Sequence, residues 1–231
     1  MRNIGKGSLL YANIAILAIA AIVYMALVSP LSVMTIGQSR RYPVYRYSSD
    51  SAVSVIIAVS WEASAMERIS DTLDSRGEHV TFAVSGEWAE QNPKELLKLY
   101  EAGHEIAVMG YRPDVDGSYD FVKKDVESSM GIVERIIGKK PVLYYCGTRD
   151  SDVSAKAGSD LGITTVLSTI DLDSVSGTSF DIEERAKKGL SAGSIIAAEP
   201  TAQFAKALPF LLDSIKNMGL RIVHIGKMLY N

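Results

Sequence analysis

Apolar residues form two kinds of pattern that alternate along the chain. Short continuous apolar runs, the pattern of buried parallel strands, occur at residues 53–60, 80–85, 106–109, 142–145, 164–168, 195–198 and 220–225. Apolar residues at helical spacing predict helices at about residues 65–76, 93–103, 121–137, 153–161 and 203–218. This alternation predicts an α/β fold with a parallel sheet covered by helices. The pattern is compatible with either an open doubly wound sheet or a barrel.

The segment 79–114 is the most complete strand–helix–strand unit of the chain. Its helix is predicted to start at Pro93, since proline suits the first helical position, and to stop at Gly103. The apolar run 106–109 is then most simply a second parallel strand reached by a right-handed crossover. The loop 110–117 leaves that strand at its C-terminal end and is predicted to be functional.

The N-terminal region predicts a membrane anchor. Residues 9–28 are apolar except for Asn13 and two tyrosines, and about 20 such residues in a helix span the hydrocarbon core of a bilayer. A cleavable signal peptide is the alternative, but residues 26–30 form a poor cleavage site. The predicted organisation is a tail at 1–8, a transmembrane anchor at 9–28, a linker at 29–50 and a globular domain at 51–231.

Composition and charge narrow the function classes. The chain has 231 residues, of which 47% are hydrophobic and 22% charged, and this suits one globular domain plus a tail. The formal net charge of −3 argues against a nucleic-acid partner. Cys146 is the single cysteine, so an intrachain disulfide is excluded.

Candidate chemistry lies where the predicted strands end, because the C-terminal ends of parallel strands carry the active site in barrels. These strand ends supply the cleft candidates Ser60, Trp61, Glu62, Met109, Tyr111, Arg112, Tyr145, Cys146 and Glu199, together with Asp171 and Asp173. The aromatic candidates, with Tyr144, would suit either stacking on sugar faces or ordinary packing. For Asp171 and Asp173 a solvated loop is favoured over a calcium site.

The sequences SGEWAE (85–90) and GHEIAVMGYR (103–112) resemble the polysaccharide deacetylases, the NodB homology or carbohydrate esterase 4 family, and are most similar to its PdaB-like sporulation branch. The resemblance runs from about Val53 to the C-terminus. It implies a distorted (β/α)7 barrel, a cytoplasmic tail and an extracytoplasmic domain that meets cell-wall glycan or envelope and spore-assembly proteins. Family members hydrolyse an amide with water bound to a divalent metal such as zinc, which one Asp and two His hold.

When the family's motifs are matched to this sequence residue by residue, the resemblance implies that the catalytic and metal-binding residues are missing. The aspartate of the PdaB-like first motif falls on Ala58, and the paired aspartates of the usual motif fall near Ser60 and Trp61. Met109 stands where the metal histidines begin, Tyr145 takes the place of an arginine, and Glu199 occupies the general-acid position. The resemblance therefore implies no metal ligand and no cofactor.

The histidines, His79, His104 and His224, have no metal-site spacing, and Cys146 has no activating histidine, so structural roles are predicted for them. Glu62 and Glu199 are either solvated acids or a new carboxylate pair. Three functions stay open: an inactive, membrane-anchored homologue that binds glycan or envelope proteins, an active deacetylase with a remodelled site, and a structural envelope or spore protein that does not use the cleft. The first is favoured.

Overall fold

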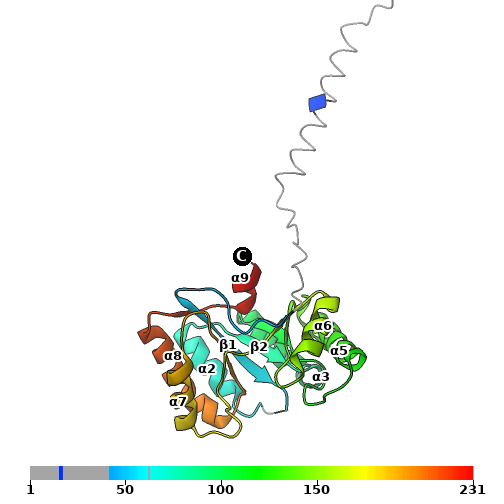
Figure 1. Ribbon diagram of the computed structural model, residues 1–231. Coiled ribbons are helices and arrows are strands. Elements are labelled where there is room, and N and C mark those ends of the chain that lie inside the picture. The colour runs from blue at the N-terminus through cyan, green and yellow to red at the C-terminus, as the bar shows by residue number, and fades with distance from the viewer. Residues whose placement is uncertain (1–15, 18–41, 62, 231) are drawn as a thin grey trace, which may run out of the picture. The chain divides into compact units, whose positions relative to one another are not determined.

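Strands and helices alternate along the chain in a computed structural model that describes residues 16–17, 42–61 and 63–230 (Figure 1). The strands are β1 (Ala52–Val59), β2 (Thr81–Val84), β3 (Glu105–Val108), β4 (Leu143–Tyr145), β5 (Thr164–Val166), β6 (Ile170–Asp171), β7 (Ile195–Ala198) and β8 (Arg221–Ile222). The helices are α2 (Met66–Arg76), α3 (Gly86–Gln91), α4 (Pro93–Glu101), α5 (Tyr119–Ile137), α6 (Ser151–Leu161), α7 (Ser179–Gly189), α8 (Ala202–Asn217) and α9 (Ile225–Tyr230). The predicted α/β class is confirmed.

The strands of the described part form one parallel sheet in the order β5-β4-β3-β2-β1-β7-β6, and β8 pairs with the start of β1. Only residues 167–169 separate β5 from β6, although β5 pairs with β4 and β6 pairs with β7 at the opposite side of the sheet. The chain from Thr164 to Asp171 therefore crosses between the two edges. The sheet is rolled into a half-barrel, consistent with the predicted (β/α)7 fold rather than with an open doubly wound sheet.

The two faces of the sheet bury different side chains. Along β1, Val53, Val55, Ile57 and Val59 belong to the core that the surrounding helices cover, whereas Ile56 and Ala58 point into the barrel. This follows from the two-residue repeat of a strand. The interior-facing side chains are small at several strands, as at Ala83, Ala107 and Ala197. Small interior residues leave space inside the barrel for other segments.

One segment that fills this space precedes β1. Val44 pairs with Val166 of β5, and Arg46 pairs with Ser194 just before β7. Val44 and Tyr47 are 5% and 8% exposed. A Cβ atom at Gly193 would collide with the carbonyl oxygen of Tyr47, and Gly193 has φ +80°, so this contact requires glycine. Residues 44–47, predicted as linker, thus belong to the folded unit, which extends N-terminally beyond the predicted boundary at residue 51.

Helix α9 closes the end of the barrel at which the strands begin. Ile225 is buried inside the barrel, and the backbone N–H of Gly226 donates to Glu105 Oε1 at 3.0 Å. Glu105 is held in turn by the Thr81 hydroxyl, which donates to its Oε2 at 2.7 Å. At the end of α9, the hydroxyl of Tyr230 donates to Thr164 Oγ1. The opposite end of the barrel remains available for a site.

Several predicted boundaries differ from the structure. The run 220–225 was predicted as one strand, but β8 ends at Ile222 and Ile225 already begins α9. Helices α3 and α7 were not predicted. The predicted tail, the anchor at 9–28 and most of the linker lie outside the described residues, apart from Ile16 and Leu17, which are helical. Of the helices that the structure describes, none combines the length and apolar character needed to cross a bilayer.

Candidate functional site

Most of the predicted cleft residues meet at the C-terminal ends of the strands. Ser60 and Trp61 follow β1, Met109 follows β3, Tyr145 ends β4 and Cys146 follows it, and Glu199 follows β7. All of them line one cavity of about 230 Å³, together with Ala58, Pro113, Asp114, Gly147, Thr148, Asp171 and Val175. The parallel sheet brings these residues together although they are far apart in sequence. Glu62, another predicted member, lies outside the described residues.

The floor and the rim of this cavity differ in exposure. Ala58, Met109 and Tyr145 are 5%, 7% and 5% exposed, and they pack into the apolar interior of the barrel. Trp61 is 74% exposed and stands at the rim. Among the predicted stacking residues, Trp61 therefore has an accessible ring, whereas the rings of Tyr144 and Tyr145 are part of the core.

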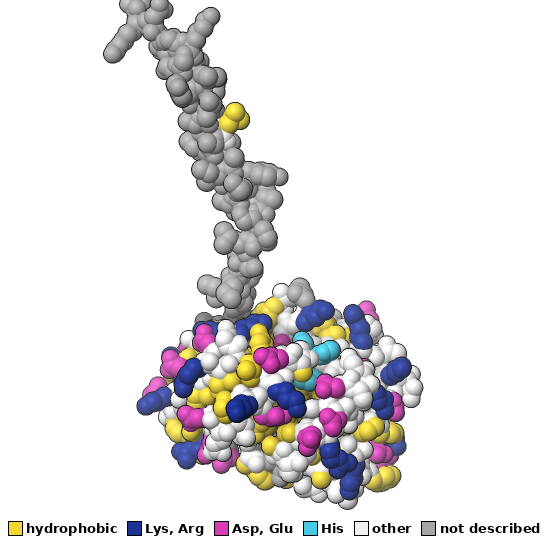
Figure 2. Space-filling view, turned by 180° about the vertical axis from the view of Figure 1, so that it is seen from behind, with side chains coloured by type: hydrophobic (Ala, Val, Ile, Leu, Met, Phe, Trp, Pro, Cys, Tyr) yellow, Lys and Arg dark blue, Asp and Glu magenta, His cyan; other side chains and the backbone are white. Residues whose placement is uncertain are grey.

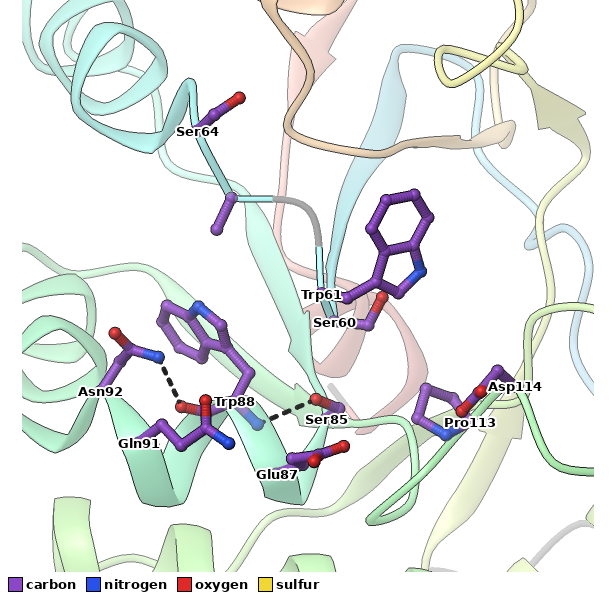
Figure 3. A pocket seen from close by; sticks show the side chains of 11 residues that line it. Ser60, Trp61, Ser64, Ser85, Glu87, Trp88, Gln91, Asn92, Pro113 and Asp114 are labelled. Carbon is purple, nitrogen blue, oxygen red and sulfur yellow. Dashed lines mark hydrogen bonds between the residues drawn. The ribbon is translucent and has the colours of Figure 1, made fainter.

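A larger cavity of about 580 Å³ adjoins the first (Figure 3). The two cavities share Ser60, Trp61, Pro113 and Asp114. The larger one is also lined by residues of α3 and its surroundings, namely Ala63, Ser64, Ser85, Glu87, Trp88, Gln91 and Asn92. Together the two cavities form one groove, called the Trp61 groove below.

The wall formed by α3 is fixed by capping. The Ser85 hydroxyl accepts from the Trp88 backbone N–H at 3.1 Å, as an N-cap does, and Asn92 Nδ2 donates to the Trp88 carbonyl at 2.9 Å (Figure 3). These residues were not predicted as part of the site. A serine three residues before Trp88 was the available signal for the cap, but the helix has too few residues to show a hydrophobic repeat.

Two groups of the cavity floor are held in their neutral form. Burial raises the pKa of the Tyr145 hydroxyl, and the carboxylates of Asp171 and Glu199 raise it further. Burial also raises the pKa of the Cys146 thiol to about 12, and this side chain is 1% exposed. A thiol in this state is neither a nucleophile nor a metal ligand. Both properties are consistent with the structural role predicted for Cys146.

The carboxylate of Glu199 is held in place by a buried serine. The Ser174 hydroxyl lies 2.5 Å from Glu199 Oε2, to which it can donate, and it accepts from the Glu199 backbone N–H at 2.7 Å. Ser174 is buried at 1% exposure. This pair fixes the carboxylate at the end of β7, facing a cavity that Asp171 also lines.

Tyr111 and Arg112, although predicted as cleft residues, do not line either cavity. Their backbone N–H groups donate to the two carboxylate oxygens of Asp125 at 3.0 and 3.1 Å, and the Tyr111 hydroxyl turns outward to Glu90. Asp125 also pairs with Arg149 at 2.8 Å, with side chains only 7% and 1% exposed. The loop after β3 is therefore held by a buried ion pair. Asp125 lies among the apolar residues of the α5 stripe, and this was the signal for its role.

The histidines line neither cavity of the groove, and Figure 2, which views the molecule from behind, shows histidine side chains gathered in one patch. The ring of His79 lies 5.8 Å from that of His104 and 6.4 Å from that of His224. His104 is 3% exposed, and its Nδ1 accepts from the Val80 backbone N–H at 3.3 Å. Burial lowers its pKa to about 4, helped by the nearby His79. The spacing in sequence gave no sign of this cluster.

Residues 51–166 match the family model of the polysaccharide deacetylases. The chain belongs to the polysaccharide deacetylase family. A structure of a family 4 carbohydrate esterase pseudoenzyme from Bacillus anthracis is similar, with a TM-score of 0.76 and 21% identity over 82% of this chain and 69% of that one. No curated protein matches the sequence.

Two further solved structures share the fold of this polysaccharide deacetylase homologue. A peptidoglycan N-acetylglucosamine deacetylase has a TM-score of 0.73 and 19% identity, with coverage of 81% of this chain and 93% of that one. A family 4 carbohydrate esterase of Bacillus subtilis, PdaA, has a TM-score of 0.73 and 17% identity, with coverage of 82% and 86%. At these identities the likeness concerns the fold.

The side chains that line the smaller cavity do not fit the divalent metal that the family implies. A hydrolytic metal site needs three nitrogen, sulfur or oxygen ligands from the protein and an open position for water. Ala58 has no donor atom, Met109 offers a buried thioether, and the phenol of Tyr145 stays protonated. Within the described part of the chain, no group of three or more His, Cys, Asp or Glu side chains could hold a metal ion.

Proposed function

We propose that this chain is a membrane-anchored polysaccharide deacetylase homologue that binds cell-envelope glycan in the Trp61 groove without deacetylating it. One observation carries the proposal: the groove is open and presents the exposed indole of Trp61, while Ala58 and Met109, which the resemblance aligns with the family's aspartate and metal histidine, supply neither a carboxylate nor an imidazole. Without a metal, nothing at these positions lowers the pKa of a water molecule toward neutrality.

The shape of the groove supports a glycan ligand. Amphipathic aromatic rings offer apolar area for stacking, and Trp61 is exposed between two hollows lined by serine, asparagine, glutamine and carboxylate side chains. A packed relic of an active site would have lost both the hollows and the exposed ring. The family of the chain points to the same ligand class.

The membrane part of the proposal rests on residues 9–28, with the domain outside the cytoplasmic membrane and a role in envelope or spore assembly. Protease added to intact protoplasts should remove the domain. Protection of the domain until the membrane is broken would show the opposite orientation.

The central experiment compares binding with hydrolysis in the full-length protein. With zinc or cobalt added, we expect no acetate release from N-acetylated peptidoglycan fragments, and no stoichiometric metal by elemental analysis. Binding to glycan should be retained, and Trp61→Ala should abolish it. Phe180→Ala is the matched control, because Phe180 is an exposed aromatic (66%) that lines neither cavity. Loss of binding in both variants would contradict a site at Trp61.

An active deacetylase with a remodelled site is the alternative, and the shared cavity of Asp171, Tyr145 and Glu199 favours it. Paired carboxylates can serve as acid and base without a metal. This alternative requires acetate release that disappears in Glu199→Gln or Glu62→Gln. Such a result would replace the non-catalytic proposal.

A further inference from the structure

The larger cavity of the Trp61 groove extends from the end of β1 to helix α3. Its volume of about 580 Å³ is within the usual range of small-molecule sites, roughly 300–1,000 Å³. The smaller cavity, at about 230 Å³, is below that range. A ligand confined to the strand ends would leave most of the groove empty, whereas an oligomer would occupy both hollows.

Trp61 lies at the boundary between the two hollows. It lines both of them, and Figure 3 shows its indole projecting from the chain next to Ser60, with Trp88 and Asn92 on one side and Pro113 and Asp114 on the other. The ring is 74% exposed, so a sugar can lie on it without displacing protein atoms. An oligosaccharide that stacks on Trp61 would place neighbouring sugars in the two hollows.

The lining of the groove carries charge of one sign. Glu87 and Asp114 line the larger cavity, and Asp114, Asp171 and Glu199 line the smaller one. No lysine or arginine lines either cavity among the described residues. None of the four carboxylates forms an ion pair within the described part of the chain. A polyanionic glycan would be repelled here, and a cationic group on a ligand would be attracted.

We infer that the groove binds an amino-sugar oligosaccharide with free amino groups, laid across both hollows with one ring stacked on Trp61. This inference rests on the proposed glycan-binding function and adds the ligand class. The free amine of an N-deacetylated amino sugar is a cation near neutral pH, and it is the group that the carboxylates of the groove complement. The N-acetylated sugar is neutral and gains nothing from them. The groove would then recognise glycan that a deacetylase has already modified.

The test uses the full-length protein and two matched ligands, the tetramer of glucosamine and the tetramer of N-acetylglucosamine, titrated calorimetrically at about pH 6, where amines are protonated. Each exposed carboxylate contact is worth about two- to fivefold in affinity. We expect the glucosamine tetramer to bind at least about fivefold more tightly at low salt. This preference should shrink at about 1 M salt, where the screening length is about 3 Å.

Variants then show which carboxylates attract the amino groups and whether the larger cavity contacts the oligosaccharide. Asp114→Asn and Asp171→Asn should each weaken the glucosamine tetramer by about two- to fivefold and leave the acetylated tetramer unchanged. Asp116→Asn is the control, because Asp116 is an exposed carboxylate of the same loop that lines neither cavity. Gln91→Ala, in the larger cavity, should weaken the tetramer and leave glucosamine monomer binding unchanged.

The outcomes separate this inference from the proposed function. Equal or tighter binding of the acetylated tetramer, abolished by Trp61→Ala, would overturn the inference and leave the glycan-binding function in place. Equal weakening by Asp116→Asn and Asp114→Asn would show nonspecific adsorption of a polycation, and it would also overturn the inference. Failure of both tetramers to bind would remove the proposed function itself.

Discussion

Acidification should destabilise the domain through His104. The imidazole is 3% exposed, and its Nδ1 accepts a backbone hydrogen bond, so the neutral ring carries its proton on Nε2. Nε2 has no partner among the described residues, and the rings of His79 and His224 lie in the same cluster. A second proton would therefore create a buried cation beside two other titratable rings, opposed only by the carboxylate of Asp74.

The sign and size of this change in stability follow from the linkage between proton binding and folding. Folding lowers the pKa of His104 from 6.5 to about 4, so the unfolded chain binds the proton more tightly and stability falls as the pH decreases between these values. About 2 kcal/mol of the stability linked to this shift is lost by about pH 5, and we expect about 1 kcal/mol after discounting for solvent at the exposed side of the cluster. The pKa of His224 is also lowered, chiefly by burial, and acts in the same direction.

Urea unfolding of the wild type and of His104→Asn between about pH 8 and about pH 5 measures this effect. The asparagine Oδ1 can accept from the Val80 N–H but cannot titrate, so the variant should lose about 1 kcal/mol less than the wild type over this range. His79→Asn removes one neighbour that lowers the pKa of His104 but leaves its burial, which is the larger cause, so most of the acid sensitivity should remain. If the wild type and His104→Asn lose the same free energy, burial of His104 does not control the acid sensitivity.

Three further predictions concern stability. Asp125→Ala should lower the free energy of unfolding in urea by about 3–5 kcal/mol, because it leaves the Arg149 cation buried without its partner. The double variant Asp125→Leu with Arg149→Met should lower it by clearly less, and equal losses would contradict a coupled pair. A domain starting at Ser48 should be less stable than one starting at Tyr42 by about 3–6 kcal/mol, since it loses the burial of Val44 and Tyr47. Equal melting temperatures of the two domains would show that residues 42–47 are dispensable for stability. Trp61→Ala should change the free energy of unfolding by less than about 0.5 kcal/mol, so that its effect on glycan binding can be attributed to the lost ring.

The sequence predicted the elements that carry a long apolar repeat or run. The strand 195–198 matches β7, and the helix predicted at 121–137 starts within two residues of α5. Helix α7 was missed because few of its residues are buried, although Thr178 and Asp181 form the capping box that marks its start. Asn92 directly precedes Pro93, the predicted start of α4, but its side chain does not cap that helix and donates instead to the Trp88 carbonyl of the preceding helix.

The candidate site was predictable to the extent that topology decides it. Ser60, Met109, Tyr145 and Glu199 follow parallel strands, and such strand ends meet at one edge whatever the loops do. Tyr111 was misplaced because Asp125, on a different element, holds its backbone and directs its ring away from the cavity. The larger cavity forms where α3 lies next to the residues that follow β1, and no local sequence pattern predicts that arrangement. The likeness to the PdaB-like branch remains a prediction.

The contacts of residues 44–47 have a consequence for synthesis of the protein. Val44 and Arg46 pair with residues that are made far later, Val166 and Ser194. The early segment can therefore form these pairs only after most of the chain has left the ribosome. Contacts of such long sequence separation slow folding and expose apolar surface to other chains. The pairing of residues 44–47 with the sheet is accordingly the folding step of this domain at which a chaperone would be needed most.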